Sequence, residues 1–278
     1  MAWEHPGGES LDYQVCQYGR SRLLVRGPKV RLAPPYTVFF GGTETYGRFV
    51  AEPFAARIAS VTSLRIANIS CINAGVDAFA EDPSLLAVAA GAETVVIQVL
   101  GAANLSNEFY SVHPRRNDRF IRATAALTSL YPEVDFTEFT FTRHLLESLE
   151  ARSPERFSTL VAAVKDQWRL QMYRLLSETR NNAVLLWIAD TPPPMTATTC
   201  KRGRDPLFVD RDMVAELGAR AGGVLEVIPT SAARAMHTQG MTFTDFEAHI
   251  ASETLNAASH EEVAQALLPV LQARQRAA

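Results

Sequence analysis

The sequence predicts an α/β protein: a three-layer α/β/α sandwich with a mainly parallel, five-stranded sheet. Two observations predict this fold class. Short apolar runs rich in β-branched residues alternate along the chain with longer segments whose apolar residues recur at helical spacing. Short crossings between successive strands of this kind require parallel pairing, with helices on both faces of the sheet. We therefore expect one central sheet that is covered by helices on both sides.

The first half of the chain supplies three of the expected strands. They cover residues 37–40, 64–72 and 94–100. Between the first two, helical spacing covers 47–60, where Pro53 should kink or restart the helix. A shorter helix should begin at Asp82 and end near Gly91, because aspartate is a good N-cap and Pro83 fits the first helical position.

The second half should contain more helix than strand. The spacing predicts one helix over 115–130 and a long amphipathic helix from Ser153 to about Arg180. Segment 134–141 is ambiguous between strand and loop. The remaining expected elements are two strands, at 183–189 and 223–228, and two helices, at 210–220 and 258–273.

We expect a single domain over residues 36–278, because the sequence shows no internal repeat and no convincing linker. Residues 1–35 should form a basic N-terminal extension packed on this domain. No acidic residue lies between Asp12 and Glu44, and the basic residues there are Arg20, Arg22, Arg26, Lys29 and Arg31. We interpret this strip as a solvated surface or, alternatively, as a rim that attracts anions.

The composition excludes several classes of protein. The chain has 278 residues, of which 47% are hydrophobic, and a formal net charge of −3, which argues against disorder and against bulk binding of nucleic acid. Its 3 cysteines cannot form a disulfide framework. No apolar run is long enough for a membrane span, and the first residues lack the pattern of a signal peptide. We therefore expect a cytoplasmic protein without membrane or nucleic-acid partners; the oligomeric state is left open.

Glycines and polar residues follow the first three expected strands. In open parallel sheets, ligands bind beyond the carboxyl ends of the strands, so these positions should line the site. Thr43 presents a hydroxyl there, Gly75 offers a backbone N–H that no side chain blocks, and Asn104 can donate from its amide. Together these groups are the parts of a nucleophile with an oxyanion hole. Their neighbours Gly42 and Glu44 should contact the substrate.

The same segments resemble the sequence blocks of the SGNH (GDSL-type) hydrolase superfamily. The first block of that superfamily has the pattern Gly-Asp-Ser-x-x-x-Gly, and the matching positions here are Gly41, Gly42, Thr43 and Gly47. Gly75 matches the glycine of the second block. The segment from Gly101 to Asn104 matches the Gly-x-x-Asn pattern of the third block. The resemblance implies an SGNH- or flavodoxin-like sandwich.

Two later segments extend the resemblance. Residues 189–193 resemble the proline loop after the fourth strand, and residues 256–264 resemble the opening of the last helix. The order and spacing of the blocks agree over most of residues 36–275. The chain also resembles a bacterial family of SGNH-like outline.

The chain departs from the superfamily where the chemistry would take place. Thr43 replaces the nucleophilic serine, and Gly42 replaces the aspartate before it. The final Asp-x-x-His block is not found: its positions are Ala251-Ser252-Glu253-Thr254. Without a base to take its proton, a hydroxyl is a poor nucleophile at neutral pH.

Two histidines are candidates for the missing base. His249 follows Asp245 by four residues, which on a helix places both on one face; the alternative is an exposed helical pair. His113 is the second candidate. We interpret His260 as a surface residue at a helix start rather than as the base.

The segment 106–119 follows the third strand and should overhang the ligand cleft. Its basic side chains could hold a carboxylate, sulfate or phosphate, and they are His113, Arg115, Arg116 and Arg119. The alternative is a helix start with solvated arginines. The sequence has no phosphate-binding loop, no HExxH and no GxGxxG after a strand, so we expect neither a metal nor a cofactor.

The resemblance implies an esterase or acyltransferase that acts on an ester or acyl group of a small molecule or carbohydrate, with an anionic substrate if the arginines hold it. Thr43 would be the nucleophile, and Gly75 and Asn104 would form the oxyanion hole. His249 or His113 would be the base. The alternative is a catalytically silent protein of the same fold that binds an anionic small molecule or carbohydrate.

Overall fold

The central feature of the fold is a parallel sheet of five strands. The structure is a computed structural model, and it describes residues 10–200 and 205–277. The strands are β1 (Thr37–Gly41), β2 (Ile66–Ser70), β3 (Thr94–Gln98), β6 (Ala183–Ile188) and β7 (Val224–Val227). They lie in the order β2-β1-β3-β6-β7, and every pair is parallel. The predicted fold class is therefore confirmed.

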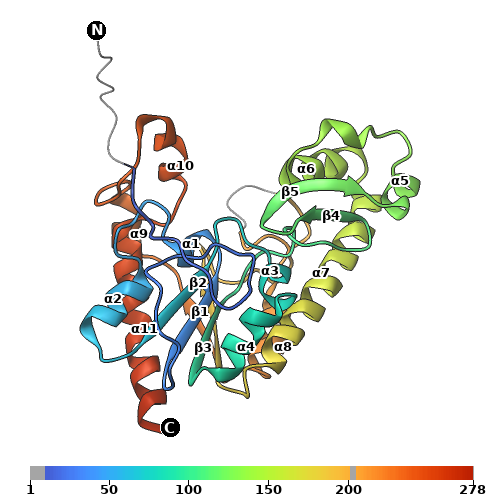
Figure 1. The fold of residues 1–278 in the computed structure, drawn as a ribbon. Helices are drawn as coiled ribbons and strands as arrows, with labels where there is room; N and C mark the ends of the chain where they lie inside the picture. Colours follow the sequence, from blue (N-terminus) through green and yellow to red (C-terminus); the bar gives the residue numbers. More distant parts are fainter. Residues whose placement is uncertain (1–9, 201–204, 278) are drawn as a thin grey trace.

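Helices cover both faces of this sheet (Figure 1). The helices on one face are α2 (Phe54–Val61) and α11 (Ala257–Ala277), and they pack on one core cluster. Those on the other face are α3 (Asp77–Ala80), α4 (Pro83–Gly91), α7 (Pro154–Ser177) and α8 (Arg211–Gly218). Successive residues of a strand point to opposite faces of the sheet. Phe39 of β1 therefore packs in the cluster that contains α2 and α11, and Phe40 packs in the cluster on the other face.

The long helix α7 begins as its sequence predicts. The Ser153 hydroxyl accepts a hydrogen bond from the Arg156 N–H at 3.3 Å, and Pro154 occupies the first helical position. Trp168 and Met172 of this helix are fully buried in the core. Because the apolar side chains keep one face, α7 packs against α3, α6 and α8, and it runs from the second sheet to the side of the central sheet (Figure 1).

A second, two-stranded sheet replaces the helix that was predicted over 115–130. It pairs β4 (Tyr110–His113) with β5 (Arg116–Ala123) in antiparallel orientation. The prediction of a helix at residues 115–124 was wrong. Phe120 of β5 is buried opposite Val112 of β4, and its backbone N–H donates to the Thr140 carbonyl, so this backbone is paired with other segments and not within a helix. The helix of this region, α5 (Ala125–Leu130), begins only after β5 ends, and the ambiguous segment 134–141 contains the short helix η1 (Phe136–Glu138).

Two groups of elements lie beyond the carboxyl ends of the strands, on either side of α1 (Thr43–Tyr46) (Figure 1). One consists of β4, β5, α5 and α6 (Thr142–Arg152). The other consists of α9 (Ser231–Ala235), η2 (Asp245–Glu247) and α10 (Ala248–Ser252). No helix of the described residues is long and apolar enough to cross a membrane.

The described part of the N-terminal segment, residues 10–35, packs on the core through Tyr18, Leu23 and Val25; residues 1–9 of the predicted extension lie outside the described residues. Arg26 corrects the idea of an exposed basic strip, because it is only 5% exposed. Its guanidinium donates to four backbone carbonyls near α1, at distances between 2.8 and 3.2 Å. A cation that is surrounded by carbonyls in this way stabilises the turn after α1, and the other four basic residues remain exposed.

Candidate functional site

The hydroxyl of Thr43 lies where β1 passes into α1. It donates a hydrogen bond to the Asn73 side-chain oxygen at 3.1 Å, and it accepts one from the Asn73 backbone N–H at 3.0 Å. Asn73 belongs to the loop after β2 and has a φ of 57°, a left-handed conformation that asparagine tolerates better than most residues. The two bonds therefore join the loops that follow β1 and β2.

Asn73 also connects this pair to the second sheet. Its amide nitrogen donates to an Asp118 carboxylate oxygen at 3.0 Å. In a second pair the donor lies on β5: the Asn117 amide nitrogen donates to the Asp77 carboxylate at 2.9 Å. Asp77 also accepts from the Ser106 N–H at 3.1 Å, and burial raises the pKa of Asp77 to about 6. The two pairs hold β5 against the loop after β2.

Glu44 is held by the last residue of β3. The Gln98 side-chain oxygen accepts from the Gly42 N–H at 3.0 Å and from the Thr45 hydroxyl at 2.6 Å, which fixes the orientation of the amide. The Gln98 amide nitrogen then donates to the Glu44 carboxyl at 2.6 Å. Burial raises the pKa of Glu44, and the nearby Asp205 carboxylate adds to the increase.

Gly75 lies against the backbone of Asn104. A Cβ atom at Gly75 would lie 1.6 Å from the Asn104 carbonyl oxygen, so only glycine allows this approach. The side-chain oxygen of Asn104 accepts from the Thr142 hydroxyl at 2.8 Å. Because this bond fixes the oxygen, the amide nitrogen of Asn104 is left as a donor, and it has no hydrogen-bond partner within residues 10–200 and 205–277.

The candidate bases are not brought to Thr43. His249 lies on α10 with its side chain 81% exposed, and its Nε2 is 3.7 Å from Glu253 rather than paired with Asp245. Asp245 belongs to the 3-10 turn η2 and His249 to α10, which follows it directly, and no hydrogen bond or ion pair joins the two side chains among the described residues. His113 ends β4, where its Nδ1 accepts from the Arg115 N–H at 3.2 Å. No histidine in the described part of the chain hydrogen-bonds to the Thr43 hydroxyl.

His260 is a core residue, which corrects its interpretation as a surface residue. It is fully buried in α11, its Nδ1 accepts from the Phe54 N–H at 3.1 Å, and its ring stacks on the Phe54 ring at 5.4 Å. Its buried Nε2 has no partner among the described residues. Burial lowers the pKa of His260 to about 3, and the charges of Arg57 and Arg26 contribute to the shift.

The predicted arginine loop is an exposed β-hairpin end. Arg115, Arg116 and Arg119 are all exposed, and Arg119 lies over the Phe141 ring at 5.9 Å. Asn117 and Asp118, between these arginines, make the contacts with the loop after β2. The sequence reasoning missed this pair, because it considered only the basic side chains of the segment and not the amide and carboxyl side chains between them.

The other arginine near the site, Arg143, begins α6 and forms an ion pair. Its guanidinium donates to both carboxylate oxygens of Asp205, at 2.8 and 2.7 Å. Arg143 is thus occupied by a carboxylate of the protein itself. The carboxyl groups of Glu44 and Asp118 have no arginine or lysine partner among the described residues.

The five-stranded parallel sheet with helices on both faces defines a three-layer α/β protein, and Thr43, Gly75 and Asn104 lie in the segments that follow its first three strands. The chain belongs to the family described as Domain of unknown function (DUF6473), whose model matches residues 1–275. No curated protein gives a significant match.

Three solved structures are similar to the chain. A protein from Lactobacillus plantarum is 12% identical, with 86% of this chain and 97% of the other covered and a TM-score of 0.43. The lipase/acylhydrolase from Enterococcus faecalis is 13% identical, with 86% and 96% covered and a TM-score of 0.42. A carbohydrate esterase family 2 enzyme with a carbohydrate-binding domain, from Corynascus thermopiles (Myceliophthora fergusii), is 12% identical, with 90% and 69% covered and a TM-score of 0.41.

Proposed function

We propose that this SGNH-like protein binds a small molecule or carbohydrate beyond the carboxyl ends of β1, β2 and β3, and that Thr43 contacts the ligand without attacking it. The observation that supports this proposal is the Thr43–Asn73 pair. The Thr43 proton is directed at an amide oxygen, which is not a base that can accept it at neutral pH. The hydroxyl is therefore suited to hydrogen bonding and not to nucleophilic attack.

A second candidate is an esterase or acyltransferase, and one observation favours it. The Asn104 amide nitrogen is left as a donor, and the Asn104 backbone lies against Gly75; an oxyanion hole needs free donors of this kind. In that reaction Thr43 would attack the acyl carbon, and His249 or His113 would have to move to the Thr43 hydroxyl to take its proton. Neither histidine contacts that hydroxyl in this structure.

Ester turnover separates the two candidates. Short-chain aryl esters are assayed with the native chain, Thr43→Ala and Asn104→Ala, each checked for native secondary structure by circular dichroism. The binding proposal expects no turnover above background in any of the three. Turnover by the native chain that disappears in both variants would establish the acyl chemistry instead, and turnover that survives Thr43→Ala would remove Thr43 as the nucleophile.

Ligand-dependent stabilisation provides the positive test of binding. The unfolding midpoint of the native chain is measured with and without small sugars and small anions, and the measurement is repeated with Thr43→Ala. A shift that Thr43→Ala removes would support binding at this site. A shift that is lost in Arg115→Ala and Arg116→Ala but kept in Thr43→Ala would place the ligand on the hairpin and contradict the proposal.

A further inference from the structure

We propose that the ligand group at Thr43 is a hydrogen-bond donor of a neutral, hydroxyl-bearing molecule such as a sugar, and that Asp118 is the positioning residue that sets this preference through Asn73. This inference rests on the proposed function and names its ligand class. It replaces the anionic ligand that the sequence suggested.

The first step concerns the orientation of the Asn73 amide. Asp118 offers only acceptor oxygens when it is ionised, so the side of the Asn73 amide that faces Asp118 must be the nitrogen. The Asn73 side-chain oxygen is then turned toward Thr43. A reversed amide would place two oxygens against each other at the Asp118 contact, which is unfavourable.

The second step concerns what the Thr43 hydroxyl has left to offer. A hydroxyl has one proton and two lone pairs. The proton is donated to the Asn73 side-chain oxygen, and one lone pair accepts from the Asn73 backbone N–H. The remaining lone pair can only accept, so the matching ligand group is an O–H or N–H. A carboxylate, sulfate or phosphate ester has acceptor oxygens at that position and does not match.

The charges around the site favour the same ligand class. Glu44 and Asp118 contribute carboxyl groups without a basic partner among the described residues, and Arg143 is paired with Asp205. An anionic group placed beside the Asp118 carboxylate would be repelled, whereas the raised pKa of Glu44 favours its neutral form, which offers hydrogen-bonding oxygens. Hydroxyl groups can donate to carboxyl oxygens, and they can also accept from the free Asn104 amide nitrogen. A molecule with several hydroxyl groups can therefore pair with the carboxyl oxygens and with the Asn104 amide nitrogen at the same time.

The test compares two sets of probes on the full chain. The neutral probes are glucose, N-acetylglucosamine and myo-inositol, and the anionic probes are acetate and sulfate at matched ionic strength. The unfolding midpoint and saturation-transfer NMR are recorded for the native chain, Thr43→Val, Asp118→Ala and Asp118→Asn. Asp166→Ala, an exposed carboxylate on α7, is the matched control for loss of one negative charge.

The expected result is stabilisation by at least one neutral probe. The shift should be lost in Thr43→Val and in Asp118→Ala and kept in Asp166→Ala. Asp118→Asn should retain the shift, because its side-chain oxygen can still accept from the Asn73 amide and keep that amide in place. A purely structural role of Asp118 would not separate these two variants when both are folded by circular dichroism.

Other results overturn the proposal in distinguishable ways. Stabilisation by acetate or sulfate that depends on Thr43, with no effect of the neutral probes, would contradict the ligand class and leave the proposed function standing. Thr43-dependent stabilisation by a sugar that is unchanged in Asp118→Ala would remove the role of Asp118. If no probe of either set gives a Thr43-dependent shift, both the inference and the proposed function fail.

A second variant tests the polarity itself. Asn73→Gly removes the acceptor of the Thr43 proton, and glycine tolerates the left-handed conformation at this position. The freed hydroxyl can then donate to an anion, so the preference for neutral over anionic probes should decrease. An unchanged preference in folded Asn73→Gly would show that the Asn73 amide does not determine it.

Discussion

Thr43 and Asn73 exchange two hydrogen bonds, although 30 positions separate them in the sequence. The Thr43 proton is directed at an amide oxygen, and no histidine of the described residues hydrogen-bonds to this hydroxyl. The first prediction follows from this arrangement: Thr43→Ser, which introduces the serine of the SGNH block that this segment resembles, will not produce hydrolysis of short-chain aryl esters above the Thr43→Ala background. Serine removes the crowding methyl group, but it supplies no group that takes the proton. Measurable turnover by Thr43→Ser would show that the methyl group, and not the missing base, prevents the reaction.

The second prediction concerns the close approach of Gly75 to Asn104. Gly75→Ala should lower the free energy of unfolding by about 2 kcal/mol or more, because its Cβ would overlap a backbone oxygen that cannot easily move. Gly42→Ala is the comparison, since its Cβ would meet the end of the Leu100 side chain at 3.0 Å, which can rotate away. Urea unfolding of both variants measures the difference. Equal losses would mean that the loop around Asn104 yields more easily than this contact indicates.

The third prediction is a pH dependence that originates in His260. Its folded-state pKa of about 3 lies below the ordinary value of 6.5, so the unfolded chain binds a proton that the folded chain refuses between these values. The contribution of His260 to stability is therefore fully present above pH 6.5. It decreases as the pH falls toward 3, by up to about 1.4 kcal/mol for each pH unit.

The control for this dependence is His260→Asn, whose side-chain oxygen can still accept from the Phe54 N–H but does not titrate in this range. Urea unfolding between pH 7 and pH 4 should show a smaller loss of stability in the variant than in the native chain. The same slope in both would assign the acid sensitivity to other groups.

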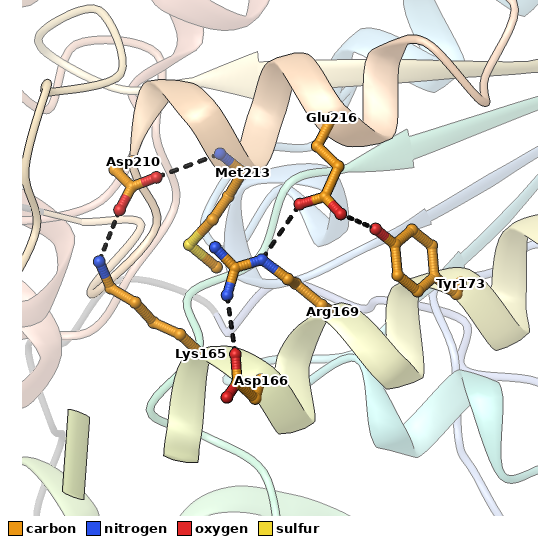
Figure 2. Close-up of polar contacts among 7 residues, drawn as sticks. All are labelled: Lys165, Asp166, Arg169, Tyr173, Asp210, Met213 and Glu216. Atoms are coloured by element: carbon orange, nitrogen blue, oxygen red, sulfur yellow. Dashed lines mark hydrogen bonds and ion pairs between the residues drawn. The ribbon is translucent and has the colours of Figure 1, made fainter. Parts of the chain in front are cut away.

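The fourth prediction compares two aspartates that are drawn in Figure 2: Asp210, which precedes α8, and Asp166, which lies on α7. Asp210 caps α8 by accepting from the Met213 N–H at 3.1 Å, and it pairs with Lys165 at 2.5 Å; both side chains of the pair are almost buried, at 12% and 13% exposure. Asp210→Ala leaves a lysine without its partner and a helix without its cap, so it should cost about 3 kcal/mol of stability.

The matched control is Asp166→Ala, at an aspartate on α7 next to Lys165. Asp166 pairs with Arg169, but its side chain is 79% exposed (Figure 2). Exposed ion pairs contribute little, so this variant should lose less than about 1 kcal/mol. Chemical unfolding of the two variants measures both values. A loss in Asp166→Ala as large as that in Asp210→Ala would contradict the assignment of the stability to burial.

The sheet and the loops at its carboxyl ends could be predicted because their signals are local. The β-branched run over β3 and the capping serine of α7 each determine a structure within a few residues of themselves. The hairpin was missed because the segment before α5 has helical spacing as well, and only its pairing across β4 and β5 decides between the two structures.

The α/β class, the five strands of the central sheet in their chain order, and the threonine at the position that resembles the serine of the SGNH block could all be predicted from the sequence. The tertiary structure alone decided what that threonine contacts. Asn73 and Asp118 are 45 positions apart in the sequence, and His260 lies 206 positions from Phe54, whose N–H donates a hydrogen bond to it. The local pattern of a sequence does not encode such partners, because they meet only when the sheet and the helices pack around one core.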